Sequence, residues 1–166
     1  MDDLVLTYKD IKLIIKKEIL FELSQYRQIT LHKNESGGML IGSKLLYDDT
    51  IEINDITQPL IEDSFSPTTF KRSDLHNGIL KEKWKKSNHT KMYLGEWHTH
   101  PQNIPFPSTV DRSNWIKLLQ ESKTESEILI FIIIGIKNNA LFIGEKYSKD
   151  INLIELREVY ECENFR

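Results

Sequence analysis

The chain has 166 residues, a formal net charge of −3 and a pI near 6.0. This length suits one domain with its own core, and the weakly acidic balance gives no sign of nucleic-acid binding. The ~20 consecutive apolar residues of a membrane span are absent, as is the pattern of a signal peptide. The single cysteine, Cys162, excludes an internal disulfide, which is typical of a reducing compartment. We therefore expect one cytoplasmic domain over residues 1–166.

The N-terminal half of the chain predicts three strands and one helix. Residues 4–8 form a short strand, and residues 9–28 a helix with isoleucines at helical spacing between charged side chains. The segment Gly37–Gly42 is typical of a buried strand that another backbone can approach closely. Residues 51–57 alternate apolar and polar side chains, which indicates a half-buried strand. The Pro-containing residues 58–72 are expected to form an irregular crossing loop.

The C-terminal half predicts two helices and further strands. Ser73 is a candidate N-cap of a helix that ends near Ser87, and the lysines of this helix are expected to form a solvated face. The continuous apolar run over residues 128–136 is typical of a central strand covered on both faces. The other predicted elements are a strand that includes residues 91–97 and stops at Pro101, a helix from residue 108, a strand over residues 141–147 and a last strand over residues 151–159. The whole pattern predicts an α/β fold with a single mixed β-sheet flanked by helices.

Two histidines at the end of one predicted strand are the first candidates for chemistry. Because residues i and i+2 of a strand share a face, His98 and His100 should project together, with Trp97 and Thr99 on the other side. Two neutral imidazoles on one face are suitable ligands for a divalent ion such as Zn²⁺. Taken alone, a His-x-His pair is a weak indication of a metal.

The helix that follows offers a third ligand. Ser108 is a suitable N-cap, and Asp111 lies in the first turn, on the helix stripe of Trp115 and Leu119 that should face the core. An inward-facing carboxylate needs a partner, because burying it unpaired costs roughly several kcal/mol. A metal held by the two histidines would be that partner. Ser108 and Asp111 could instead form only a capping pair, but their combination with the histidines favours a metal site.

This combination of residues resembles the JAMM signature of the MPN+ metallopeptidases. The matching residues are His98-Thr99-His100-Pro101, seven intervening residues, and Ser108-x-x-Asp111. The segment Glu35-Ser36-Gly37-Gly38 through Gly42 is similar to the glutamate-bearing segment of that family. The resemblance spans roughly residues 8–150. It implies a JAMM/MPN, cytidine-deaminase-like fold and a single metallopeptidase domain over residues 1–166.

The resemblance also implies a role for each polar residue. His98, His100 and Asp111 would hold Zn²⁺ and leave a fourth position for water, whose pKa the metal lowers. Glu35 would take the proton from this water and pass it to the leaving amine. Ser108 would donate a hydrogen bond to the developing oxyanion.

Several other residues stay open at this stage. Glu96 lies on the same strand face as the two histidines, so it could compete as the base or support the site, although Glu-Ser-Gly-Gly favours Glu35. The other histidines are expected at the surface: His32, His76 and His89. Trp97 and Trp115 are expected to be packing residues.

A narrower resemblance points to a substrate class. The run Tyr93-Leu94-Gly95-Glu96-Trp97-His98-Thr99-His100-Pro101, with Pro105, Pro107 and Trp115, is similar to the compact bacterial JAMM proteins of CBASS anti-phage operons. Members of that group remove proteins joined by a ubiquitin-like E1–E2 system, and the known target is the C-terminus of a cyclic-oligonucleotide synthase. The resemblance therefore implies a protein-conjugate substrate bearing the C-terminal tail of a ubiquitin-like or nucleotidyltransferase protein. A metal-dependent amidase or peptidase acting on a small molecule, and a non-catalytic MPN scaffold, remain alternatives, although scaffold relatives lack the ligand residues retained here.

Overall fold

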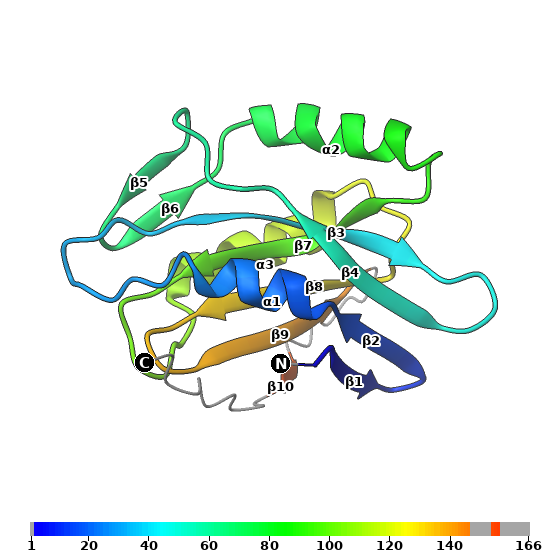
Figure 1. Cartoon of the computed structure of the whole chain (residues 1–166), viewed down its shortest axis with the longest axis horizontal. Helices are drawn as coiled ribbons and strands as arrows, with labels where there is room; N and C mark the ends of the chain where they lie inside the picture. Colours follow the sequence, from blue (N-terminus) through cyan, green and yellow to red (C-terminus); the bar gives the residue numbers. More distant parts are fainter. Residues whose placement is uncertain (1, 147–153, 157–166) are drawn as a thin grey trace.

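A mixed β-sheet forms the centre of the computed structural model, which describes residues 2–146 and 154–156. The strands follow the spatial order β1-β2-β4-β3-β7-β8-β9-β10 (Figure 1). Their bounds are β1 Leu4–Tyr8, β2 Ile11–Ile15, β3 Gly37–Lys44, β4 Thr50–Ile56, β7 Met92–Thr99, β8 Ile128–Ile134, β9 Asn139–Glu145 and β10 Ile154–Leu156. The remaining elements are α1 Lys17–Ser24, the small hairpin β5 Ser64–Ser66 with β6 Thr69–Lys71, α2 Leu75–Lys86 and α3 Thr109–Glu121.

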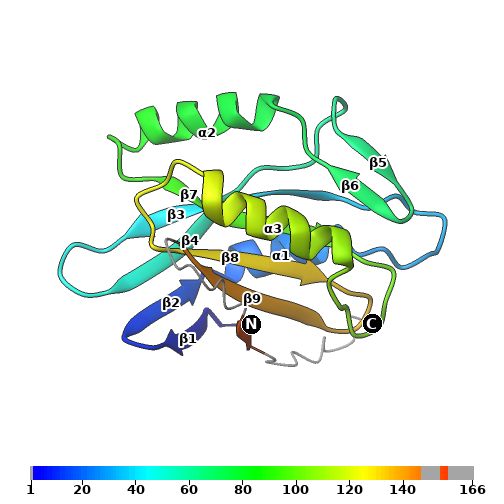
Figure 2. The same cartoon turned by 180° about the vertical axis from the view of Figure 1, so that it is seen from behind.

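Helices cover both faces of the sheet. Helix α1 lies on one face, α3 lies on the other, and α2 contacts β3 and β7 (Figures 1 and 2). Two apolar clusters fill the layers between them, one including Leu23 and Trp97 and the other including Trp115 and Phe131. Every residue of β8 is buried, because this strand pairs with β7 and β9 and is covered on both faces. The predicted mixed sheet flanked by helices is confirmed.

The helix predicted over residues 9–28 is wrong in its first half. Residues Ile11–Ile15 form β2, which pairs antiparallel with β1 and parallel with β4, and the helix covers only Lys17–Ser24. The side chains of Leu13 and Ile15 are fully buried, which is the alternation of a strand. The spacing of the isoleucines fits the period of a helix as well as that of a strand. These residues form a strand because they pair with β1 on one side and with β4 on the other.

Three expectations for residues 58–87 also change. The crossing loop contains the β5–β6 hairpin. Helix α2 has Asp74 rather than Ser73 at its N-cap. His76, expected at the surface, is fully buried, because it lies between Thr57 and the side chain of Asp63. The lysine face of α2 is mostly exposed as expected, although Lys83 forms an ion pair with Asp55.

The last predicted strand is described only in part. Strand β10, Ile154–Leu156, lies within the predicted residues 151–159, and its remainder lies outside the described residues, as does Cys162. Within the described part of the chain, no helix is long and apolar enough to cross a membrane.

Candidate metal centre

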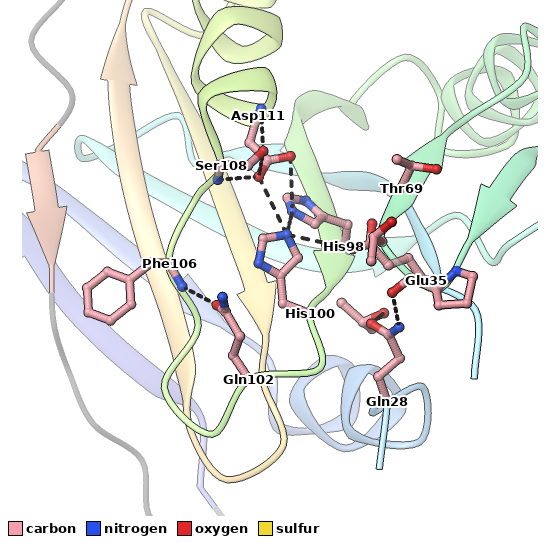
Figure 3. Close-up of polar contacts among 12 residues, drawn as sticks. Gln28, Glu35, Thr69, His98, His100, Gln102, Phe106, Ser108 and Asp111 are labelled. Atoms are coloured by element: carbon pink, nitrogen blue, oxygen red, sulfur yellow. Dashed lines mark hydrogen bonds and ion pairs between the residues drawn. The ribbon is translucent and has the colours of Figure 1, made fainter. Parts of the chain in front are cut away.

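The two histidines lie where β7 ends, on the face covered by α3. The backbone N–H of His100 donates to the carbonyl of Ile134 at 3.0 Å, so the β7–β8 pairing extends past the end of β7. Both histidine residues are only 8% exposed, and their Nε2 atoms lie 3.1 Å apart (Figure 3). Trp97 and Thr99 lie on the other side of β7, as predicted, and both are buried. The strand parity predicted from His-x-His therefore holds.

Asp111 faces these two imidazoles from the first turn of α3. Its Oδ1 lies 3.5 Å from Nε2 of His98, and its Oδ2 lies 3.5 Å from Nε2 of His100. The same carboxylate accepts from the backbone N–H and the hydroxyl of Ser108, both at 2.6 Å, and the Asp111 N–H donates back to the Ser108 hydroxyl. Capping and facing the histidines are thus compatible, because the capping box holds the carboxylate in place over them.

The three side chains match the donor set and spacing of a zinc site. Their ligand atoms all lie within 4.8 Å of one another. Two ligands of a tetrahedral Zn²⁺ at ~2.1 Å from the metal lie about 3.4 Å apart, which matches the 3.1 Å and 3.5 Å separations found here. Two imidazole nitrogens facing each other and a carboxylate need a cation or a shared proton between them. The chemistry of this cluster therefore fits a divalent metal.

Within the cluster, the carboxylates and the imidazoles each stabilise the charged form of the other. Burial favours the neutral form of Asp111, but hydrogen bonds and charge from His100 and His98, together with the bond from Ser108, lower its pKa well below the ordinary value. Burial also opposes charging of His100, yet the neighbouring Asp111 and Glu35 raise the pKa of this imidazole overall. The site thus stabilises positive charge at its centre.

Glu35 lies beside this cluster and is itself buried. Its Oε1 is 4.0 Å from Nε2 of His100, and the residue is 7% exposed. Burial raises the pKa of Glu35 to about 7; the charge of His100 opposes this increase and that of Asp111 adds to it. The pairing of Gly37 with His98 in the antiparallel β3–β7 ladder explains the placement, because continuing the ladder sets Glu35 opposite His100.

Glu96, the alternative carboxylate, is engaged elsewhere. Arg72 donates from Nε to its Oε1 at 2.6 Å, and the hydroxyl of Tyr93 donates to the same oxygen at 3.3 Å. This carboxylate oxygen is already occupied by two donors away from the histidines, so the geometry favours Glu35. No local sequence pattern indicates Arg72 as a partner of Glu96, because the two residues are 24 positions apart.

Comparison with known proteins identifies the family. Residues 21–146 match the family described as prokaryotic homologs of the JAB domain. The chain belongs to this family. The JAB-domain chain is 32% identical over 151 residues to a CD-NTase/cGAS isopeptidase of Escherichia coli (strain TW11681), covering 90% of this chain and 92% of the relative. A relative of the same name in Vibrio cholerae serotype O1 is 31% identical over 159 residues, covering 93% and 97%.

The fold of the JAB-domain chain also has a solved counterpart. The solution structure of a protein from Desulfitobacterium hafniense superposes with a TM-score of 0.56 at 20% identity, covering 90% of this chain and 92% of that protein. At this identity the likeness concerns the fold alone. The predicted membership of the JAMM/MPN+ group, with its likeness to the bacterial CBASS-associated proteins, is confirmed by the family match and the curated relatives.

Proposed function

We propose that this JAB domain is a zinc-dependent isopeptidase. Its substrate would be a protein conjugate made by a bacterial ubiquitin-like E1–E2 system, and cleavage would release the C-terminus of a cyclic-oligonucleotide synthase in anti-phage defence. The observation that carries the proposal is the convergence of His98, His100 and Asp111 beside a buried Glu35. The similarity to CD-NTase/cGAS isopeptidases over about nine-tenths of the chain supports the substrate class.

The metal would be held by His98, His100 and Asp111. When bound, Zn²⁺ supplies a Lewis acid that lowers the pKa of a water ligand and polarises the scissile carbonyl. The capping box keeps the Asp111 carboxylate over the two imidazoles, so little rearrangement is needed on metal binding. His98 is further held against Trp115, whose ring stacks on Phe131 with centroids 4.7 Å apart.

Glu35 and Ser108 would handle the proton and the developing charge. Glu35 accepts a proton from the attacking water and delivers it to the departing amine as the C–N bond breaks, giving a free carboxylate and an amine. A carboxyl group with a raised pKa suits this exchange near neutral pH. The Ser108 hydroxyl, which now donates to Asp111, can rotate to donate to the carbonyl oxygen as negative charge grows there.

The surroundings of the centre suit an extended protein tail. The β5–β6 hairpin lies beside Glu35, and the backbone N–H of Glu35 donates to the carbonyl of Ser66 in β5. Among the described residues β6 pairs only with β5, and its other edge can pair with the backbone of an extended peptide, which would leave selectivity to neighbouring side chains. Ile104 and Phe106 in the loop before α3 and Phe65 in β5 are all exposed and could contact a folded partner.

The test is a purified conjugate of the synthase incubated with zinc-loaded wild type, with Glu35→Gln and with Glu62→Gln as an exposed control. Wild type and Glu62→Gln should release the synthase, a chelator should abolish release, and added zinc should restore it. Glu35→Gln should keep one zinc per chain and lose about 100-fold or more in turnover. An intact conjugate together with hydrolysis of small amides would favour the small-molecule amidase. Absence of both activities in zinc-loaded protein would favour the scaffold.

A further inference from the structure

Gln28 is a fully buried polar residue just beyond the end of α1, and the proposed mechanism gives it no role. Its side-chain amide spans three segments of the chain. Nε2 donates to the carbonyls of Lys33 at 2.7 Å and Pro67 at 2.9 Å. Oε1 accepts from the hydroxyl of Thr99 at 3.2 Å. Two carbonyl acceptors fix the orientation of the amide, because turning it over would set Oε1 against both carbonyl oxygens.

These three segments surround the backbone of Glu35. Lys33 lies two residues before it, and Pro67 follows Ser66, whose carbonyl accepts from the Glu35 N–H at 2.9 Å. Thr99 holds the residue after Glu35 from the opposite strand: its hydroxyl accepts from the Ser36 N–H at 3.0 Å, and its N–H donates to the Ser36 carbonyl at 2.9 Å. Figure 3 shows Gln28 below Glu35, on the side away from Asp111.

We propose that Gln28 is a positioning residue that sets the distance of the Glu35 carboxylate from the metal ligands. This inference rests on the proposed function for its catalytic consequence. Through its three hydrogen bonds, the Gln28 amide connects the segment that carries Glu35 to the turn of the β5–β6 hairpin and to strand β7, which carries His98. Thr99 connects this hydrogen-bond network to the metal ligands, because it is the residue between His98 and His100 at the end of β7. Loss of the amide leaves the Lys33 and Pro67 carbonyls without this shared donor. The segment that contains Lys33 and the turn that contains Pro67 can then move apart.

The first test separates positioning from folding by its effect on kcat. Gln28→Leu removes the amide at similar volume, and Gln25→Leu makes the same change at an exposed site near the same helix end. A displacement of about 1 Å costs roughly 100-fold in rate. We therefore expect kcat of zinc-loaded Gln28→Leu to fall about 10- to 100-fold, with KM within about twofold and one zinc per chain retained. Gln25→Leu should match the wild type.

A double substitution shows whether the effect passes through Glu35. In a Glu35→Gln background, adding Gln28→Leu should lower the residual rate by less than about twofold, because the group being positioned is already lost. A purely structural role would lower the rate equally in both backgrounds and would overturn the proposal. Should Gln28→Leu fail to fold, Thr99→Val removes the linking hydroxyl alone, and Thr99→Ser should restore the rate.

Amide hydrogen exchange tests the positioning even if no substrate is found. Exchange over residues 33–37 should be at least about tenfold faster in Gln28→Leu than in Gln25→Leu or wild type, while exchange in β8 stays unchanged. If the wild type is inactive but Gln28→Leu still shows this faster exchange, the proposed function is refuted and the positioning role of Gln28 stands. Unchanged exchange over residues 33–37, or a normal kcat in Gln28→Leu, would overturn the positioning role.

Discussion

Replacing Glu35 by glutamine should make the metal-free protein more stable at alkaline pH. Burial raises the pKa of this carboxyl from its ordinary 4.5 to about 7. Above pH 4.5 the unfolded chain has released the proton, whereas the folded protein keeps it until about pH 7. The free energy of unfolding of the wild type therefore falls as the pH rises through this window and levels off above it. Glutamine has no such charge to bury.

The size of the effect follows from the two pKa values. Because one pKa unit corresponds to about 1.4 kcal/mol, the advantage of Glu35→Gln should grow by about 2.5 kcal/mol between pH 5 and pH 8. Urea unfolding of chelator-treated protein, followed by tryptophan fluorescence at both pH values, measures this growth. Glu62→Gln, the same change at an exposed side chain, should differ little from the wild type at either pH. Zinc should reduce the advantage, because a neighbouring cation favours the ionised carboxylate.

A difference between Glu35→Gln and wild type that is the same at pH 5 and pH 8 would refute this reasoning. It would mean that Glu35 reaches water in the folded protein and is not the buried carboxyl described here.

Three further predictions concern the centre and its supports. Asp111→Ala should abolish stoichiometric zinc binding, measured by elemental analysis. The control is Asp74→Ala at the N-cap of α2, where the side chain forms no capping hydrogen bond; this variant should keep one zinc per chain. His76→Ala should lower the free energy of unfolding by about 3 kcal/mol in urea titrations, because it leaves the buried carboxylate of Asp63 without its histidine partner at 3.0 Å. Gly78→Ala should raise the same quantity by about 0.5–1 kcal/mol, since a methyl group at this exposed helical position meets nothing within 4 Å; a decrease would refute the helix assignment.

The resemblance and the local patterns of the sequence were enough to predict much of the centre. His98 and His100 share a face because strand residues alternate, and Ser108 with Asp111 forms a capping box because these residue types suit a helix start. Both relations depend on neighbours within four residues. The uninterrupted apolar run of β8 likewise predicts its central place, since only a strand covered on both faces can bury every side chain.

Only the tertiary structure decided the remaining features. Glu35 comes to lie opposite His100 through the β3–β7 register, whose pairs, such as Gly42 with Met92, are at least 50 positions apart. The sequence around Glu35 by itself could equally have formed an exposed loop. His76 is buried because Asp63 and Thr57 form hydrogen bonds with its ring, and Gln28 is buried because the Pro67 carbonyl and Thr99 form hydrogen bonds with its amide. The residues Ile11–Ile15 form a strand because β1 and β4 pair with them. In each case at least one of the partners that decide between two local possibilities lies far along the chain, where no spacing rule reaches.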